Sequence, residues 1–577
     1  MTEQTQSAYM FPTSVKEVEK LGWDYIDIIL FSGDAFIDHP SSGTAMIARV
    51  LQREGWRVAV VPQPGWQDDL RDFRKLGVPR LFFGVNSGAM DSMVNHYTAA
   101  KRLRSNDAYT PGGQAGHRPD YAVTVYTRIL KRLYPDVPVV IGGIEASLRR
   151  LTHYDYWADR LFPSVLVESG ADLLIYGMGE RPVTAVARAI AAGEDLRGIP
   201  QTAFFAEEPC PRAGEGTLLL HGYERVCRDK DAFIEDFNVE EREANRLHAA
   251  TLIEPYPGGY VQVNPPFPPE TTEEIDSYYA LPFTKQPHPR YRGKDIPAWE
   301  MIKNSLTIHR GCFGGCSFCT IAAHQGKFIR SRSPESIVRE VERLTAMPHF
   351  KGIISDVGAP TANMYGLRGR DASRCARCSR PSCLFPSRCP NMEHSHRALL
   401  ELYSRITAVP GVRKAFIGSG IRYDLFLDKD GFLDEYSEKY LREVVTNHTS
   451  GWFKVAPEHT EDHVLRLMSK PPFALFSVLR REFSRIAARE KLPYRIVPYF
   501  ISSHPGCTFQ DMKSLSKNKE LRGIQLEQVQ DFTPTPMTAS SVMFYTGKDL
   551  SGRPVFVERS IQGKKIQKSL FFRKNAL

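Results

Sequence analysis

Short apolar segments alternate with amphipathic helical segments along most of this chain, and this alternation restricts its fold more than any other feature. The first series of apolar runs lies between residues 26 and 177 and reads IDIILF, RVAVV, PRLFFG, VPVVIGG and DLLIYG. Helical stretches such as 43–55, 120–134 and 180–193 lie between or after them. Strands that alternate with helices form a parallel sheet covered on both faces. We therefore predict an N-terminal doubly wound, Rossmann-like α/β domain over residues 1–205.

A second alternation begins near residue 303. Its apolar runs lie between residues 305 and 529 and read SLTIHR, GIISDV, VRKAFIGSG, WFKVAP, YRIVPYFI and GIQLEQV. The clearest helix between them covers 333–347, where Ser333 fits the N-cap and Pro334 the first helical position. Six such units predict a partial (β/α)6 barrel over residues 301–560, in which chemistry collects at the carboxyl ends of the strands.

Three further segments have a different composition. Residues 206–300 combine a charged helical stretch with proline-rich text such as NPPFPPETTEE. Proline lacks an amide donor and disfavours helix at the preceding residue, so we predict a helical and proline-rich connector there. Residues 366–392 form a Cys-rich insertion within the barrel, and residues 561–577 form a basic C-terminal tail. A chain of 577 residues is in any case too long for one core.

Charge and cysteine usage limit the partners and the location that we expect. Lys and Arg outnumber Asp and Glu by 75 to 66, a net +9 that permits a nucleic-acid partner but does not favour one. The first twenty residues lack the pattern of a signal peptide, and no apolar run reaches membrane-spanning length, so we expect a cytoplasmic protein with no membrane association. Cytoplasmic thiols are kept reduced, so clustered cysteines indicate metal ligands or catalytic groups. Seven of the ten cysteines lie between residues 312 and 389.

Three of these cysteines directly follow the first apolar run of the barrel. Cys312, Cys316 and Cys319 have the spacing Cys-x3-Cys-x2-Cys, and Gly314 and Gly315 let the backbone bend between them. Three thiolates on so short a loop can surround a 4Fe-4S cubane and leave one iron without a cysteine. A structural zinc site would normally have a fourth protein ligand.

This loop resembles the cluster-binding motif of the radical S-adenosylmethionine (radical SAM) superfamily. The segments GSGIRYDL, KVAPEHTEDHVLRLMSKP and IGGIEASLRRLTHYDYW are similar to the YgiQ family of radical SAM proteins, and the resemblance covers nearly the whole chain. It implies that Cys312, Cys316 and Cys319 bind a 4Fe-4S cluster whose fourth iron binds S-adenosyl-L-methionine. It also implies an enzyme that cleaves this cofactor reductively to a 5'-deoxyadenosyl radical, with a flavodoxin- or ferredoxin-type electron donor. The substrate is not identified by the resemblance.

The resemblance also indicates where the remaining cofactor contacts would lie. Phe318 matches an aromatic position that packs near the adenine, and Ser355 or Asp356 stands where many members carry Gly-Gly-Glu for the methionyl amino group. Positions suited to ribose and carboxylate contacts are occupied by Ser419, Gly420, Lys454 and Glu458. Each of these residues is equally compatible with a structural role at the end of a strand.

A second group of cysteines lies in the Arg-rich insertion. Cys375, Cys378, Cys383 and Cys389 have the spacing Cys-x2-Cys-x4-Cys-x5-Cys. Four thiolates can complete either a tetrahedral zinc site or a fully ligated second iron-sulfur cluster, and both interpretations stay open, with free thiols as the third. The neighbouring arginines suit neutralisation of a thiolate-rich site better than contact with phosphate.

Cys507 is a weak catalytic candidate. It follows the fifth apolar run, where a thiol could donate a hydrogen atom to a radical, but a packing role is the more common one. The same reasoning favours structural roles for His324, His459 and His504.

The N-terminal domain resembles the cobalamin-binding fold found before many radical SAM barrels. The expected Asp-x-His-x-x-Gly motif is missing, and the nearest text is Asp38-His39-Pro40-Ser41-Ser42-Gly43, so we do not expect cobalamin. Two alternatives to the enzyme are a non-catalytic iron-sulfur electron carrier or sensor, and a zinc-stabilised RNA-binding or RNA-modifying protein. The three-cysteine loop and the barrel pattern favour the enzyme.

Overall fold

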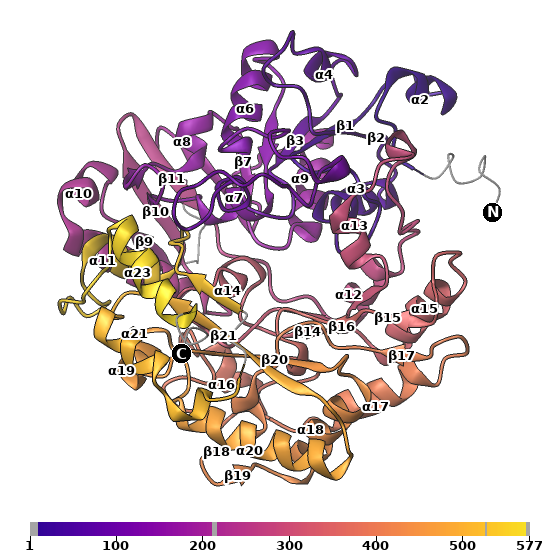
Figure 1. Cartoon of the computed structure of the whole chain (residues 1–577). Helices are drawn as coiled ribbons and strands as arrows, with labels where there is room; N and C mark the ends of the chain where they lie inside the picture. Colours follow the sequence, from indigo (N-terminus) through magenta and orange to yellow (C-terminus); the bar gives the residue numbers. More distant parts are fainter. Residues whose placement is uncertain (1–9, 211–215, 525–527, 573–577) are drawn as a thin grey trace. The chain divides into compact units, whose positions relative to one another are not determined.

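The computed structural model describes residues 10–210, 216–524 and 528–572 (Figure 1). Parts of four predicted segments lie outside these residues, namely the start of the N-terminal domain, residues 211–215 of the connector, the middle of the run GIQLEQV and the end of the basic tail. The chain divides into two compact units. Unit 1 comprises residues 1–243, 248–268 and 277–303, and unit 2 comprises residues 244–247, 269–276 and 304–577.

Unit 1 is built on a sheet that has nine strands among the described residues, in the order β2-β1-β3-β4-β7-β8-β11-β10-β9. The first five strands in this order are parallel, and they are β2 (Val58–Pro62), β1 (Ile28–Ser32), β3 (Phe82–Asn86), β4 (Val139–Ile141) and β7 (Leu173–Ile175). The strand order reverses between β1 and β3, which is the point where doubly wound folds bind ligands.

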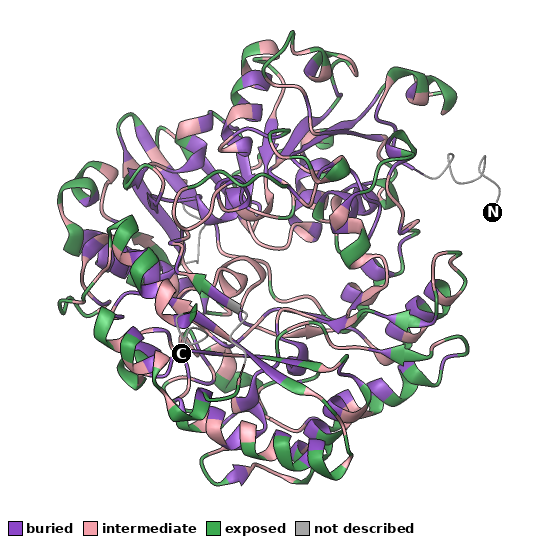
Figure 2. Cartoon of the chain, in the orientation of Figure 1, coloured by how far each residue is buried: buried purple, intermediate pink, exposed green. Residues whose placement is uncertain are grey.

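Helices cover both faces of this parallel part. Ile29 and Phe31 of β1 lie in one buried core with Tyr126 of α6 (Ala122–Leu133). The helices α3 (Gly43–Arg53) and α9 (Glu180–Ala192) pack against each other, and α3 contacts β1 and β2. Figure 2 shows buried strands bordered by helices whose outer faces are exposed. The predicted doubly wound α/β fold is confirmed.

Residues 206–300 contain the helices α10 (Tyr223–Arg228), α11 (Lys230–Ala244) and α12 (Thr272–Tyr279), and part of this segment also extends the same sheet. The added strands are β9 (Thr217–Leu219), β10 (Thr251–Tyr256) and β11 (Gly259–Val263), which join the sheet through β8 (Thr202–Ala206). β8 pairs antiparallel with β7 and β11, and β10 and β11 form a hairpin. The turn of this hairpin is made by Pro257 and by Gly258 at φ +82°. The proline-rich run at 264–271, which suggested the connector, follows β11 and is in neither a helix nor a strand.

Unit 2 contains short strands that pair in parallel and in chain order. β12 (Ser305–Thr307) pairs with β16 (Asp356–Gly358), and β15 (Ile353–Ile354) pairs with β17 (Lys414–Ala415). A parallel bridge joins Ile421 to Val455, and the series continues through β20 (Trp452–Glu458), β21 (Arg495–Ser502) and β22 (Gln528–Asp531). This order is that of a partial (β/α)6 barrel, as predicted.

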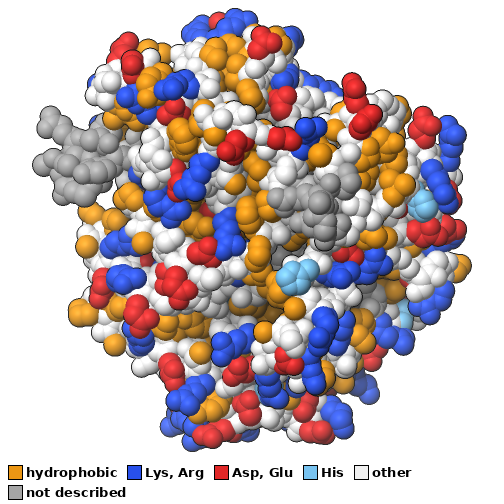
Figure 3. Space-filling model, turned by 180° about the vertical axis from the view of Figure 1, so that it is seen from behind, with side chains coloured by type: hydrophobic (Ala, Val, Ile, Leu, Met, Phe, Trp, Pro, Cys, Tyr) orange, Lys and Arg blue, Asp and Glu red, His pale blue; other side chains and the backbone are white. Residues whose placement is uncertain are grey.

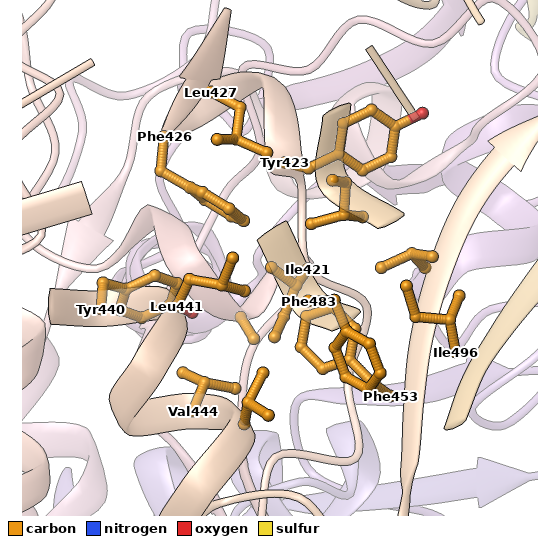
Figure 4. Close-up of a cluster of buried hydrophobic side chains, with 14 of the residues drawn as sticks. Ile421, Tyr423, Phe426, Leu427, Tyr440, Leu441, Val444, Phe453, Phe483 and Ile496 are labelled. Carbon is orange, nitrogen blue, oxygen red and sulfur yellow. The ribbon is translucent and has the colours of Figure 1, made fainter. Parts of the chain in front are cut away.

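Helices cover the outer face of this barrel, and they are α15 (Pro334–Thr345), α17 (Arg397–Thr407), α18 (Glu435–Asn447) and α20 (Ala474–Arg489). The hydroxyl of Ser333 accepts a hydrogen bond from the Ser336 amide at 3.1 Å, which confirms the predicted N-cap of α15. Figure 4 shows Phe453 of β20 packed beside Phe483 of α20 in the apolar core. Among the described residues, no helix has both the length and the apolar character needed to cross a membrane.

Burial alternates along β20. Phe453 and Val455 are buried in the core against the helices, whereas Trp452 and Lys454 are exposed. Successive side chains of a strand point to opposite faces, so Lys454 lies on the face of the barrel sheet that the helices do not cover.

Candidate functional site

The cluster loop, residues 311–319, follows β13 (His309–Arg310) at the carboxyl end of the first barrel strand. Gly311 has a φ of +86°, and a side chain there would lie 2.3 Å from the Phe328 carbonyl oxygen, so this position requires glycine. The Cys312 amide donates to the Gly326 carbonyl at 3.1 Å, and the Cys319 amide donates to the Cys316 carbonyl at 3.0 Å. These bonds fold the loop compactly around its three cysteines.

The three thiols of the loop lie close enough to influence one another. All three are half-buried. Burial, together with the neighbouring thiolates of Cys316 and Cys312, raises the pKa of Cys319 to about 12. Burial also raises the pKa of Cys312. A cationic metal centre would stabilise all three as thiolates, so the donor set fits a 4Fe-4S cluster held by three cysteines.

Arg422 donates a hydrogen bond to one of these sulfurs. Its Nη1 lies 3.2 Å from Cys316 Sγ, while Nε and Nη2 donate to the Asp424 carboxylate at 3.0 and 2.6 Å. The Arg422 side chain is 9% exposed, so its charge acts in a largely dry environment. Although burial opposes the ionised form, the charge and hydrogen bonds of Arg422 lower the pKa of Asp424. Arg422 lies in the segment GSGIRYDL, where no local pattern marks it as a contact of a cysteine 106 residues away.

A buried chain of hydrogen bonds anchors the cluster loop to α22 (Ala539–Thr546). The Ser540 amide donates to the Ser317 carbonyl at 2.9 Å, and the two serine hydroxyl oxygens lie 2.8 Å apart. Ser540 Oγ also lies 2.6 Å from His504 Nε2, and His504 Nδ1 lies 2.8 Å from the Pro505 carbonyl. Burial lowers the pKa of His504 to about 4, so the ring is neutral, donates from Nδ1 and accepts from Ser540. This histidine therefore has the structural role that we expected.

Two of the predicted cofactor residues are brought together. The Asp356 carboxylate accepts hydrogen bonds from the Gly418 amide at 2.8 Å, from the Ser419 amide at 3.1 Å and from the Ser419 hydroxyl at 2.6 Å. Asp356 thereby holds the loop after the third strand, and its oxygens are directed to that loop. Ser355 is exposed, and its amide donates to the Asn304 carbonyl at 3.0 Å.

The other predicted cofactor residues lie in different surroundings. Glu458, at the end of β20, is buried beside Lys470, whose Nζ lies 3.6 Å from Oε1, and burial raises the pKa of Glu458. Its charge acts on Cys319, which places it near the cluster loop. The half-buried Phe318 ring meets the His504 ring edge to face at 6.1 Å. Lys454 and Gly420 are exposed. Apart from the adjoining residues of the chain, no described atom lies within 4 Å of the point where a Cβ of residue 420 would be.

The second cysteine group is partly enclosed. Burial raises the pKa of Cys375, and the nearby thiolates of Cys378 and Cys389 raise it further. Lys327, whose side chain is buried, places Nζ 3.9 Å from Cys378 Sγ. In the part of the chain that the structure describes, no three His, Cys, Asp or Glu side chains converge as the ligands of a single metal ion would. A cubane differs from such a site because its cysteines bind separate irons.

Cys507 is enclosed in the apolar core of unit 2. Its sulfur lies 3.4 Å from His459 Nε2 and 3.6 Å from Gln567 Oε1, and burial raises its pKa to about 12. The His459 ring accepts a hydrogen bond from the Glu461 amide at 3.0 Å. These contacts favour packing over hydrogen-atom transfer for this thiol.

The anchoring of the cluster loop by α22 can be tested with Ser540→Ala. This change leaves the buried Ser317 hydroxyl and His504 Nε2 without their partner, which costs about 1–3 kcal/mol for each buried group. We expect reconstituted Ser540→Ala protein to lose iron faster than the wild type during anaerobic incubation with a chelator. The matched control is Ser541→Ala, because Ser541 is also buried but donates to the Thr535 carbonyl. Equal iron loss from the two variants would contradict this role.

The contact between Arg422 and Cys316 predicts a change in redox potential. A positive charge and an N–H donor at a ligand sulfur stabilise the reduced cluster, so removing them lowers the midpoint potential. We expect Arg422→Gln to lower it by about 60 mV, a tenfold shift in a one-electron equilibrium, and Arg422→Lys to lower it less. Potentiometry followed by electron paramagnetic resonance (EPR) measures this value. Arg388→Gln is the control, because Arg388 donates to the Asp424 and Leu427 carbonyls instead; an equal change there would refute the assignment.

Comparison with known proteins agrees with this geometry. A family model described as Radical SAM N-terminal matches residues 10–305. A UPF0313 protein of Porphyromonas gingivalis is 53% identical over 570 residues, which cover 97% of this chain and 90% of that protein. UPF0313 proteins of Bacteroides thetaiotaomicron and Geobacter sulfurreducens are 52% and 46% identical, each over 97% of this chain and over 93% and 91% of their own lengths.

A solved structure shares the fold. The radical S-adenosylmethionine methyltransferase TsrM from Kitasatospora setae, with cobalamin and a [4Fe-4S] cluster bound, matches with a TM-score of 0.51 and 15% identity over 90% of this chain and 74% of that chain. At this identity the likeness concerns the fold alone. The family model and the close relatives together show that this chain belongs to the UPF0313 (YgiQ) family and is a radical SAM enzyme.

Proposed function

We propose that the enzyme cleaves S-adenosylmethionine at a cluster held by Cys312, Cys316 and Cys319, and that the radical formed acts on a substrate at the carboxyl ends of the barrel strands. The observation that carries this proposal is the convergence of three thiols on one loop, with Arg422 donating to a ligand sulfur. When bound, the cluster supplies the electron for reductive cleavage to methionine and a 5'-deoxyadenosyl radical. The chain's own task is to hold the cofactor and to exclude water.

The loop after the third strand is suited to the cofactor's nucleoside. Asp356 fixes this loop through three hydrogen bonds, so its backbone is preorganised. We assign the ribose contact to Ser419 and Gly420, because the surroundings of Gly420 leave room for close approach of a ligand to the backbone. In this assignment Asp356 acts through Ser419 and does not contact the cofactor itself.

Two charged residues on the fourth strand would take different roles. Lys454 is exposed on the face of β20 opposite the helices, and we assign it to an anionic group of the cofactor or substrate. Glu458 is paired with the buried Lys470, and the pair adjusts the charge beside Cys319. Phe318 would pack near the adenine, with its ring held by His504.

We propose that this chemistry does not use cobalamin. Within the sequence Asp38-His39-Pro40-Ser41-Ser42-Gly43, the fully buried Asp38 carboxylate is bound by the buried Arg49 guanidinium. His39 is also fully buried, and its Nδ1 accepts a hydrogen bond from the Ser41 amide at 3.1 Å. Both side chains are engaged inside unit 1, so neither is presented to a corrin ring as a ligand.

Electron transfer requires a donor protein, and we propose one of the flavodoxin or ferredoxin class. A nucleic-acid partner is less well supported. On the face drawn in Figure 3, basic and acidic side chains are interspersed. Within the Arg-rich insertion, Arg374 pairs with Asp371 at 3.4 Å, and Arg380 donates to the Phe385 and Ser387 carbonyls.

The enzyme assignment predicts formation of 5'-deoxyadenosine. Protein reconstituted anaerobically with iron and sulfide, reduced with dithionite and given S-adenosylmethionine should produce it, as measured by liquid chromatography and mass spectrometry. Cys312→Ala should abolish production, because the loop then holds only two thiolates. Cys507→Ala should retain it, because that thiol packs in the core. Reduced, cluster-loaded protein that binds the cofactor without cleaving it would favour the electron carrier instead.

A further inference from the structure

We propose that Cys375, Cys378, Cys383 and Cys389 bind a second iron-sulfur cluster, and that this cluster passes electrons to the one held by the cluster loop. Four cysteines suffice for a fully ligated cluster, which stores an electron without binding substrate. The metal site rests on the four cysteines and their surroundings. Its relay role rests on the proposed function as well.

Backbone hydrogen bonds link the four cysteines in two pairs, and the side chain of Asn391 brings the two pairs together. The Cys378 amide donates to the Cys375 carbonyl at 3.1 Å, and the Cys389 amide donates to the Cys383 carbonyl at 2.7 Å. Asn391 lies two residues after Cys389, and its amide nitrogen donates to Cys375 Sγ at 3.4 Å and to the Asp371 carbonyl at 2.9 Å. The insertion is therefore folded so that its first and last cysteines lie near each other.

A buried cation compensates the charge of this group. The Lys327 side chain is 4% exposed, and its Nζ lies 3.9 Å from Cys378 Sγ and 2.9 Å from the Arg380 carbonyl. A buried ammonium is costly unless an anion lies beside it. Four thiolates around a metal centre supply that anion, and the N–H donors of Lys327 and Asn391 suit ligand sulfurs.

The Cys-rich insertion contacts the cluster loop directly. The Cys383 amide donates to the Phe313 carbonyl at 3.0 Å, and the Ser382 hydroxyl donates to the Gly314 carbonyl at 2.8 Å. A side chain at Gly315 would lie 2.6 Å from the Pro381 carbonyl oxygen, so glycine permits this approach. Phe313 is bonded to Cys312, so the path between Cys383 and Cys312 contains one hydrogen bond and is otherwise covalent.

Both cysteine groups also border one apolar core. Cys312 of the cluster loop, and Cys383 and Cys389 of the insertion, pack against the buried residues Phe313, Met364, Leu367, Leu384, Met392 and Leu425. An apolar shell controls water access and redox potential at a metal site. Zinc has no redox chemistry, and a structural zinc site gains nothing from contact with a redox centre. The shared core therefore favours iron and sulfide over zinc.

The relay moves one electron in each step. A reduced donor protein of the flavodoxin or ferredoxin class is oxidised by one electron, which reduces the second cluster. That electron then passes to the cluster held by the loop, and the second cluster returns to its oxidised state, with no bond formed or broken. The surface of the insertion is suited to an acidic donor, because its exposed side chains include Arg370 and Arg377.

The metal site is tested in full-length Cys312→Ala/Cys316→Ala/Cys319→Ala protein, which lacks the thiols of the cluster loop and retains the second group. After anaerobic reconstitution we expect equal amounts of iron and acid-labile sulfide, and an EPR signal on reduction with dithionite. Adding Cys375→Ala and Cys378→Ala should remove both. Adding Cys210→Ala and Cys227→Ala instead should remove neither, because those cysteines are not among the four of the second group. Zinc without sulfide, or no metal at the second group, would overturn the proposal.

The relay is tested in Cys375→Ala/Cys378→Ala protein with the cluster loop intact. Iron at the loop and an unchanged thermal unfolding midpoint show that the variant is folded. We expect dithionite, which reduces the loop cluster directly, to support 5'-deoxyadenosine formation near the wild-type rate. With reduced flavodoxin as donor, the rate should fall by at least about tenfold. An equal rate with flavodoxin would overturn the relay. If the wild type formed no product even with dithionite, the proposed function would fail, while the iron and sulfide measurement would still decide the site.

Discussion

The hydrogen bonds that other segments make to the cluster loop are the interactions on which the candidate site depends. A short loop that contains three cysteines and several glycines has few hydrogen bonds of its own, so it needs donors from other segments to keep its shape. Those donors are Ser540 of α22, Arg422 after the third strand, and Ser382 with Cys383 of the insertion. Each comes from a different part of unit 2, so the loop is formed correctly only when the barrel is folded.

In the barrel, the residues that pack in the core and the residues that are candidates for binding lie on different faces of the strands. Phe453 and Val455 of β20 pack with the helices, while Lys454 between them points away from the core. At the carboxyl ends, Asp356 uses both carboxylate oxygens to hold the loop that contains Ser419. A strand therefore contributes alternate residues to the core and to the open face, and its end positions a loop for binding.

Much of the fold could be predicted from local sequence patterns. The apolar runs predicted the parallel strands of both units, and Ser333 and Pro334 predicted the start of α15. The extension of the first sheet by β9, β10 and β11 could not be predicted, because the turn formed by Pro257 and Gly258 lies in a segment that resembles a connector. A strand at the edge of a sheet is specified by its pairing partner more than by its own composition.

The sequence by itself determined the candidate donor sets, because cysteines that bind one metal centre commonly lie close together along the chain. Cys312, Cys316 and Cys319 are recognisable from their spacing alone. The tertiary structure decided which side chains support these ligands. Arg422 is 106 residues from Cys316, Lys327 is 51 residues from Cys378, and Ser540 is 223 residues from Ser317. Hydrogen bonds depend on distance in space, so these contacts arise only after the barrel brings distant strand ends and loops together.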